Sequence, residues 1–126
     1  MKKYFIIALV LFTLLSCSKE EGYGGLASIS GKIFGKDFNS NGVLVNDDYI
    51  GGIKVYISKH GESAYFDSMD SAYNGSFKFK NLYAGKYDLW VFGDCDSCAW
   101  DQVYKLITVE ISKKEDKVVN DIEISF

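Results

Sequence analysis

From Ala27 to the end of the chain, hydrophobic and polar side chains alternate with a period of two residues. This alternation predicts β-strands with one buried face, because successive side chains of a strand point to opposite sides of its sheet. No window of helical length shows a period of 3.6 residues. The pattern predicts seven strands, at residues 27–34, 52–58, 63–69, 76–80, 86–92, 105–112 and 121–126.

The apolar phase of these strands is the predicted core, since its members fall on one side of each strand. They are Ile29, Ile33, Ile53, Val55, Ile57, Phe77, Phe79, Tyr87, Leu89, Val91, Ile107, Val109, Ile111, Ile122, Ile124 and Phe126. The opposite phase is mainly polar, but it carries three aromatic residues: Tyr56, Trp90 and Phe92.

Turn chemistry separates the strands. The sequence YNGS at residues 73–76 is typical of a hairpin turn, and the charged run at residues 112–117 is expected to form another turn. Short strands with frequent turns predict an all-β fold, a seven-stranded antiparallel sandwich of two sheets with Greek-key connections. The 126 residues are enough for one such domain.

The charge of the chain argues against one class of partner. The formal net charge is −3, from 14 basic and 17 acidic residues, and every basic residue is a lysine. Nucleic-acid-binding proteins use basic patches and arginine forks to contact phosphates and bases. We therefore expect no nucleic-acid partner.

The first residues have the organisation of an export signal. Lys2 and Lys3 precede an apolar run over residues 4–15, and Ser16 and Cys17 follow it. The run is shorter than the ~20 residues of a membrane-spanning helix, so a signal peptide is predicted over residues 1–16. Residues 17–26 are polar, acidic and glycine-rich, which predicts a flexible tether before a folded domain over residues 27–126.

The sequence LLSC, which ends at Cys17, resembles the lipobox of bacterial lipoproteins. The resemblance implies that Cys17 becomes the first mature residue and carries the lipids. The following SKEE (residues 18–21) is similar to the acidic export tag of surface lipoproteins in the Bacteroidetes, with an ordinary solvated linker as the alternative. The expected location is the outer membrane, at the cell surface or on its periplasmic face.

A second resemblance covers most of the domain. The runs GGIKVYIS and DSAYNGSFKFKNLYAGKYDLWVF are similar to prealbumin-like β-sandwiches. This group includes carboxypeptidase-regulatory-like domains, collagen-adhesin B-type domains and the B repeats of serine-aspartate-repeat adhesins. Such domains are usually stalks, spacers or accessory modules, so the resemblance implies a non-enzymatic role in adhesion, spacing or support of a surface assembly.

The segment DFNSNGVLVNDD (residues 37–48) resembles the calcium loop that the adhesin B repeats carry after their first strand. Calcium takes roughly six to eight oxygen ligands around a tight glycine turn. The predicted ligands of a structural Ca²⁺ are the side chains of Asp37, Asn39, Asn41 and Asp48, with Asp47 as an alternative to Asp48, and the carbonyl of Val43. The competing interpretation is a polar loop whose side chains bond their own backbone.

Cys95 and Cys98 form a C-x-x-C motif. If Cys17 is acylated, two cysteines are left, and in an exported protein we expect them to form a disulfide. A thioredoxin-like redox motif would need a helix that the pattern does not predict, and a zinc site would need about four ligands.

No catalytic arrangement is evident, and we expect a protein that is not an enzyme. The one histidine, His60, precedes Gly61 and is expected in an exposed turn, and the chain lacks a G-x-S-x-G motif. The alternative function is carbohydrate binding, with sugars stacking on Trp90 and Trp100. The pattern favours a plainer role for these rings, in which they cover a central strand or pack under a loop.

Overall fold

The computed structural model describes residues 20–95 and 99–126. Within them, one turn of 3₁₀-helix, η1 (Ala99–Asp101), accompanies the strands. No helix in these two ranges is long and apolar enough to cross a membrane. Cys17 and Cys98 lie outside the described residues, so the signal peptide, the lipid anchor and the disulfide stay predictions.

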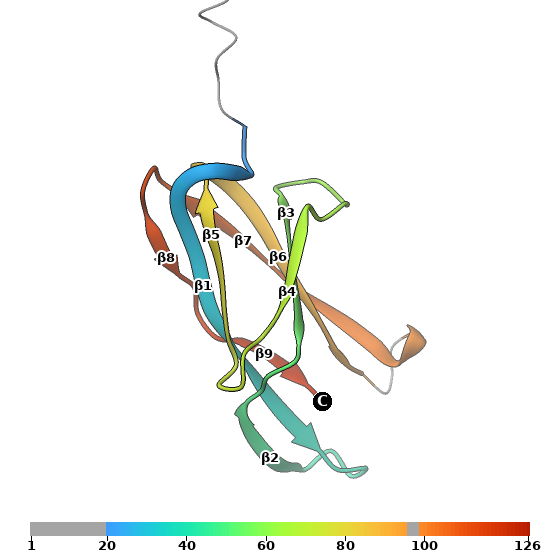
Figure 1. The fold of residues 1–126 in the computed structure, drawn as a ribbon. Helices are drawn as coiled ribbons and strands as arrows, with labels where there is room; N and C mark the ends of the chain where they lie inside the picture. The colour runs from blue at the N-terminus through green and yellow to red at the C-terminus, as the bar shows by residue number, and fades with distance from the viewer. Residues whose placement is uncertain (1–19, 96–98) are drawn as a thin grey trace, which may run out of the picture.

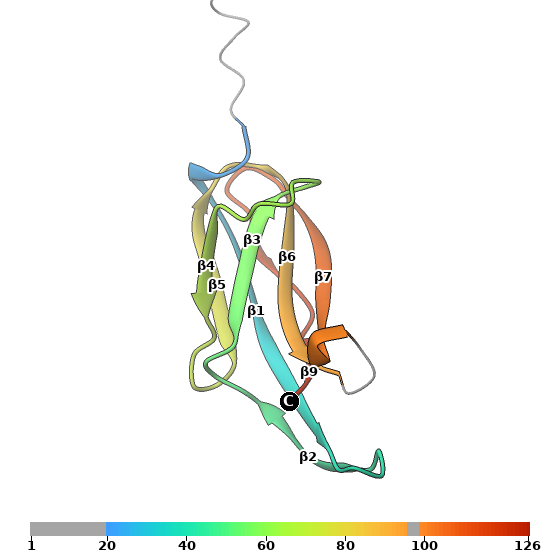
Figure 2. The ribbon, with the colours of Figure 1, turned by 90° about the vertical axis from the view of Figure 1, so that its right-hand side faces the viewer.

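Two sheets pack face to face (Figures 1 and 2). The first contains β2 (Leu44–Tyr49), β1 (Tyr23–Phe38) and β5 (Ser76–Leu82) in that order, and β8 (Asp116–Val118) and β9 (Ile122–Ser125) also pair with β1. The second has the order β4 (Asp67–Asp70), β3 (Lys54–Lys59), β6 (Gly85–Asp94) and β7 (Gln102–Ile111). The predicted all-β, two-sheet sandwich is confirmed.

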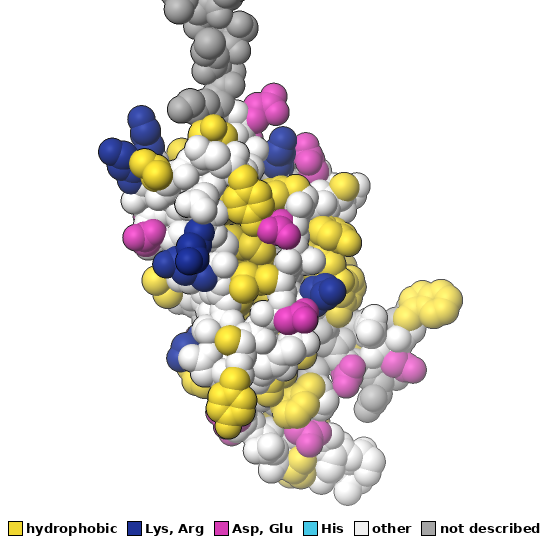
Figure 3. Space-filling model, viewed as in Figure 1, with side chains coloured by type: hydrophobic (Ala, Val, Ile, Leu, Met, Phe, Trp, Pro, Cys, Tyr) yellow, Lys and Arg dark blue, Asp and Glu magenta, His cyan; other side chains and the backbone are white. Residues whose placement is uncertain are grey.

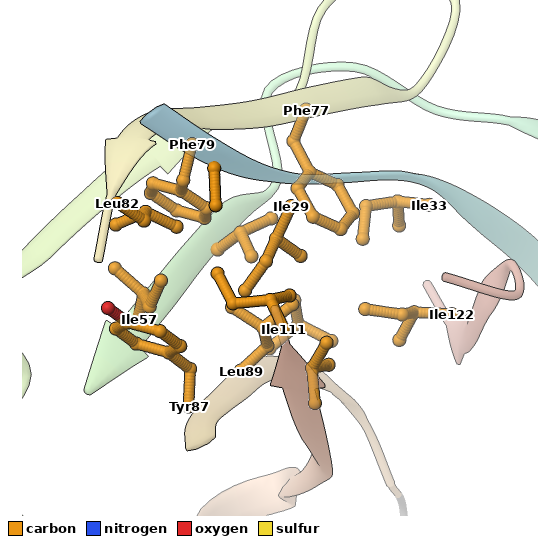
Figure 4. Packing of buried hydrophobic residues seen from close by; sticks show 14 of the residues in the cluster. Ile29, Ile33, Ile57, Phe77, Phe79, Leu82, Tyr87, Leu89, Ile111 and Ile122 are labelled. Atoms are coloured by element: carbon orange, nitrogen blue, oxygen red, sulfur yellow. The ribbon is translucent and has the colours of Figure 1, made fainter. Parts of the chain in front are cut away.

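The core lies between the sheets, where side chains from both inner faces interdigitate (Figure 4). Most of the predicted core residues are buried. Two further residues, Ala27 and Leu82, also belong to the buried cluster although they were not predicted. Ile53 and Ile107 are only partly buried and pack against its edge. Phe126 is 43% exposed, which corrects its assignment to the core.

Two strands were not expected, so the described part of the chain has nine strands instead of seven. All six residues of β2 are exposed, and therefore no alternation marks it in the sequence. Strand β8 has three exposed residues and begins within the predicted charged turn. Both β8 and β9 pair with β1 in parallel, which corrects the fully antiparallel arrangement, because the chain returns to the first sheet after β7 in the second.

Strand β1 begins at Tyr23, inside the range predicted as a flexible tether. Buried Tyr87 explains this early start, since its hydroxyl accepts a 2.8 Å hydrogen bond from the Gly22 N–H and donates a 2.7 Å bond to the Tyr83 carbonyl. The Tyr83 N–H donates in turn to the Gly22 carbonyl, at 2.8 Å. The segment entering β1 is thus bonded to the sandwich.

At the opposite end from this segment, the β1–β2 hairpin extends beyond the body of the sandwich (Figure 2). No residue of β2 is buried, so this strand is largely open to solvent. The hairpin and the outer face of the four-stranded sheet are the two regions where predicted site residues lie.

Candidate functional site

The outer face of the four-stranded sheet carries aromatic side chains on three neighbouring strands. In β6, Tyr87, Leu89 and Val91 point into the core, so Trp90 and Phe92 point outward. The ladder places Tyr56 of β3 beside Trp90 and Tyr104 of β7 beside Phe92. The sheet therefore collects these rings on one surface.

The rings are in mutual contact. Trp90 stacks on Tyr56 with centroids 5.6 Å apart and an interplanar angle of 13°. Tyr65, from the segment between β3 and β4, contacts both rings edge-on at 4.7 and 6.2 Å. Phe92 meets Tyr56 and Tyr104 edge-on at 6.0 and 6.4 Å. We call Tyr56, Tyr65, Trp90, Phe92 and Tyr104 the aromatic face.

A shallow hollow of about 280 Å³ opens on the aromatic face. Trp90, Phe92, Tyr104 and Leu106 line its apolar part, and Glu62 and Ser63 supply polar groups at its side. Tyr104 is 60% exposed and Phe92 45%, so both rings are open to a ligand. In Figure 3, which shows this sheet nearly edge-on, hydrophobic side chains reach the surface along its right-hand side.

Asp88 lies on the same outward phase of β6, yet it is only 6% exposed. One carboxylate oxygen accepts hydrogen bonds from His60 Nδ1 at 2.9 Å and from Thr108 Oγ1 at 2.8 Å. The other oxygen accepts from the Gly61 N–H at 3.0 Å. Burial alone would raise the pKa of this carboxyl, but the hydrogen bonds from His60, Gly61 and Thr108 outweigh it and lower the pKa below its usual value.

Because an ionised carboxylate only accepts hydrogen bonds, His60 must carry its proton on Nδ1. His60 is half exposed, with 51% of its side chain accessible, and so the predicted exposed turn has a buried acceptor beneath it. The positive φ of 82° at Gly61 is a conformation that glycine adopts readily, which allows the tight turn over Asp88.

The predicted calcium loop forms the tip of the β1–β2 hairpin. The side-chain oxygen of Asn39 accepts hydrogen bonds from the backbone N–H groups of Asn41 and Val43, at 2.9 and 3.0 Å. The Val43 carbonyl accepts from the Asn39 N–H at 2.9 Å, and an Asp48 oxygen accepts from the Tyr49 N–H at 2.7 Å. Three of the proposed ligands thus bond to the protein backbone.

The remaining acids of the loop lie in the ladder, with Asp37 opposite Asn46 and Asp47 opposite Lys36. Within the described residues, no cluster of three or more His, Cys, Asp or Glu side chains could hold a metal ion. The loop has the hydrogen bonds of the competing interpretation, a polar turn bonded to its own backbone, and calcium binding there stays a prediction.

The two predicted stacking residues differ in setting. Trp90 is half-buried and central to the aromatic face, whereas Trp100 is 93% exposed in η1 and takes part in none of the ring pairs among the described residues. Cys95 ends the β6 side of the same connection, and its N–H donates to the Asp101 carbonyl at 2.9 Å.

Four residues of this region were not predicted as site residues: Tyr65, Tyr104, Glu62 and Asp88. The strand predicted from residue 105 begins at Gln102, and extending the alternation back by two residues would have placed Tyr104 on the phase opposite the core. Tyr65 was expected in a strand over residues 63–69, but β4 begins only at Asp67, so Tyr65 and Glu62 both lie in the preceding loop. Only the fold brings them beside Trp90.

No protein-family model matches the sequence, and no curated protein matches it. Among solved structures, the fold is similar to that of a candidate carbohydrate-binding protein from Pseudomonas aeruginosa, known from its crystal structure. The TM-score is 0.50 at 12% sequence identity, over 83% of this chain and 91% of that chain. At this identity the likeness shows a shared β-rich fold.

Proposed function

We propose that this chain is a non-enzymatic carbohydrate-binding module of the bacterial cell envelope, held at the outer membrane by lipids on Cys17. The observation that carries the proposal is the hollow on the aromatic face, where an apolar floor of Trp90, Phe92 and Tyr104 lies beside Glu62 and Ser63. The lipobox resemblance of LLSC supports the anchor.

The chemistry of sugars matches this combination. A pyranose ring presents a face of C–H groups, which gains dispersion energy against a flat aromatic ring, and a rim of hydroxyls that need hydrogen-bond partners. The name given to the structural neighbour supports the same class of ligand. Nothing in the aromatic face needs to react with the sugar, and we assign it binding alone.

The test is a glycan array followed by calorimetric titration of the mature protein. We expect Trp90→Ala and Tyr104→Ala to weaken binding of an array hit by roughly tenfold or more, because each removes a ring from the floor. Tyr73→Ala is the matched control, since Tyr73 is 99% exposed in the β4–β5 turn outside the hollow. Binding that survives both floor variants, with folding verified by circular dichroism, would remove the proposal.

A second candidate function is support of a surface assembly through protein contacts. The projecting β1–β2 hairpin favours it, because Phe38, Val43, Leu44 and Val45 are each at least 44% exposed there. Cross-linking in intact envelopes tests this function: adducts formed from a photoreactive residue at Val43, and absent from one at Tyr73, would support it.

A further inference from the structure

The segment between β3 and β4 covers one side of the aromatic face, and its attachment suggests what it does. It begins at the turn His60–Gly61 and continues through Glu62 and Ser63 to Tyr65. In Figure 2 this connection is at the top of the four-stranded sheet. We call residues 60–65 the wall loop.

The backbone hydrogen bonds of the wall loop are concentrated at its start. The His60 N–H donates to the Lys86 carbonyl of β6 at 3.1 Å, and the Glu62 N–H to the Lys59 carbonyl at 3.0 Å. The Ser58 hydroxyl reaches the Glu62 carbonyl at 3.4 Å, which is a long contact. The buried anchor of the loop is Asp88, which binds His60 and Gly61 through separate oxygens.

We propose, resting on the proposed function, that Asp88 is the positioning residue of the sugar site: it holds the wall loop on β6 so that Glu62 and Ser63 face the hollow, contact sugar hydroxyls and select uncharged glycans. The register supports this position. Asp88 and Trp90 are successive outward residues of β6, opposite Thr108 and Leu106 of β7, so the anchor is one rung from the floor.

The charges around the hollow give the selectivity. Its lining contains one carboxylate, Glu62, and no lysine among the described residues. The outward-facing lysines nearest in register are Lys54 of β3 and Lys86 of β6, which the ladder places opposite Asp70 and Glu110. Most lysines visible in Figure 3 lie on its left-hand side, over β1 and β8, away from the four-stranded sheet. A uronate or sialate would therefore meet a negative wall without a compensating cation.

The experiment measures binding of three probes to the mature protein: cellohexaose, mannohexaose and a galacturonate hexamer. We expect the protein to bind at least one neutral hexamer and to reject galacturonate. Asp88→Asn should weaken neutral binding by roughly tenfold, because the amide replaces one acceptor oxygen by a donor and loses a charged hydrogen bond. Asp70→Asn, the same change at an exposed position of β4, should leave the binding of the neutral hexamers unchanged.

Two readouts separate positioning from a general effect on stability. Amide hydrogen exchange at residues 61–65 should accelerate in Asp88→Asn while the exchange of β6 stays as in the parent. Glu62→Gln should raise galacturonate binding relative to neutral binding, and a loss of stability alone would not change that ratio.

The outcomes distinguish the two proposals. If Trp90→Ala abolishes neutral binding and Asp88→Asn retains it with unchanged loop exchange, the positioning role is wrong and the sugar site stands. A preference of the parent protein for galacturonate would overturn the selectivity. If none of the three probes and no array glycan binds, both proposals fail.

Discussion

The aromatic face and the β1–β2 hairpin are both rich in exposed side chains, but only the first is backed by a core. Behind Trp90 lie Leu89 and Val91, each fully buried, whereas every residue of β2 is exposed. The hairpin carries the recognisable motif, and the aromatic face carries none. A side chain is preorganised for a ligand when packing and hydrogen bonds fix its conformation, and a motif in the sequence does not by itself provide that packing.

Polar side chains show the same contrast. Asp88 is buried and receives hydrogen bonds from a loop and from a second strand, so its partners hold separate elements together. Asn39 and Asp48 bond only to backbone groups within four residues of themselves. Local bonds of this kind shape a turn, and they do not build a site across elements.

The largest difference should appear when a leucine is truncated in each region. Leu89 is fully buried behind the aromatic face, and Leu89→Ala should lower the free energy of unfolding by about 2–5 kcal/mol through lost burial and an unfilled cavity. Leu44→Ala in the hairpin should change it by less than about 0.5 kcal/mol, since Leu44 is already 44% exposed. Urea unfolding measures both, and equal losses would contradict the comparison.

A hydroxyl in each region offers a smaller perturbation. Tyr87→Phe removes a buried acceptor for the Gly22 N–H and a donor to the Tyr83 carbonyl, and should cost about 1–3 kcal/mol. Tyr49→Phe removes an exposed 2.7 Å bond to Asp121, and water can replace it with no measurable loss. Faster amide exchange at Gly22 and Tyr23 in the Tyr87→Phe variant alone would locate the effect at the start of β1.

Much of the fold was predictable because burial leaves a periodic trace. Ile29, Val55, Phe77, Leu89 and Ile122 were assigned to the core from alternation, and all are buried. Strand β2 left no trace, because a strand exposed on every residue has no hydrophobic phase. The start of β1 was missed for another reason: glycine-rich composition predicts flexibility, and the distant Tyr83 and Tyr87 order Gly22.

The candidate site was predictable only in part. Alternation identified Tyr56, Trp90 and Phe92 as outward-facing rings, but it favoured a covering role for them. Whether such rings remain open depends on Tyr65 and Glu62, which come from a loop. The position of this loop and the pairing of the strands decide which rings stay exposed, and neither can be read from a single sequence.

The pH dependence of stability sharpens the comparison at a smaller scale. The pKa of Asp88 is lowered in the folded protein, so its stabilising effect is complete above the unfolded value of about 3.9 and is lost as the pH falls through the lower folded value. The stability gap between the parent and Asp88→Asn should therefore be widest near neutral pH and should close only in acid below about pH 4.

The matched carboxylate is Asp48 in the hairpin, whose side chain accepts a hydrogen bond from the neighbouring Tyr49 N–H. Asp48→Asn should change the free energy of unfolding by less than about 0.5 kcal/mol at neutral pH, because Asp48 is exposed. The variant His60→Gln measures how much of the stabilising effect of Asp88 comes from the imidazole, and the remainder comes from the hydrogen bonds of Gly61 and Thr108. A gap for Asp88→Asn that is constant from neutral pH to acid would show that the ionised form is not what the fold stabilises.

The smallest expected effect concerns calcium at the hairpin tip. The Asn39 side chain and the Val43 carbonyl already accept backbone hydrogen bonds that hold the turn, so an ion would add little to its order. We therefore expect millimolar calcium to leave the melting temperature unchanged, and chelator to have no effect on it. Asn39→Ala, which removes the turn's acceptor, should destabilise the hairpin equally with and without calcium. A rise in melting temperature on adding calcium that Asp37→Asn abolishes would show that the loop rearranges into a metal site, and that the hairpin, like the aromatic face, is a built site.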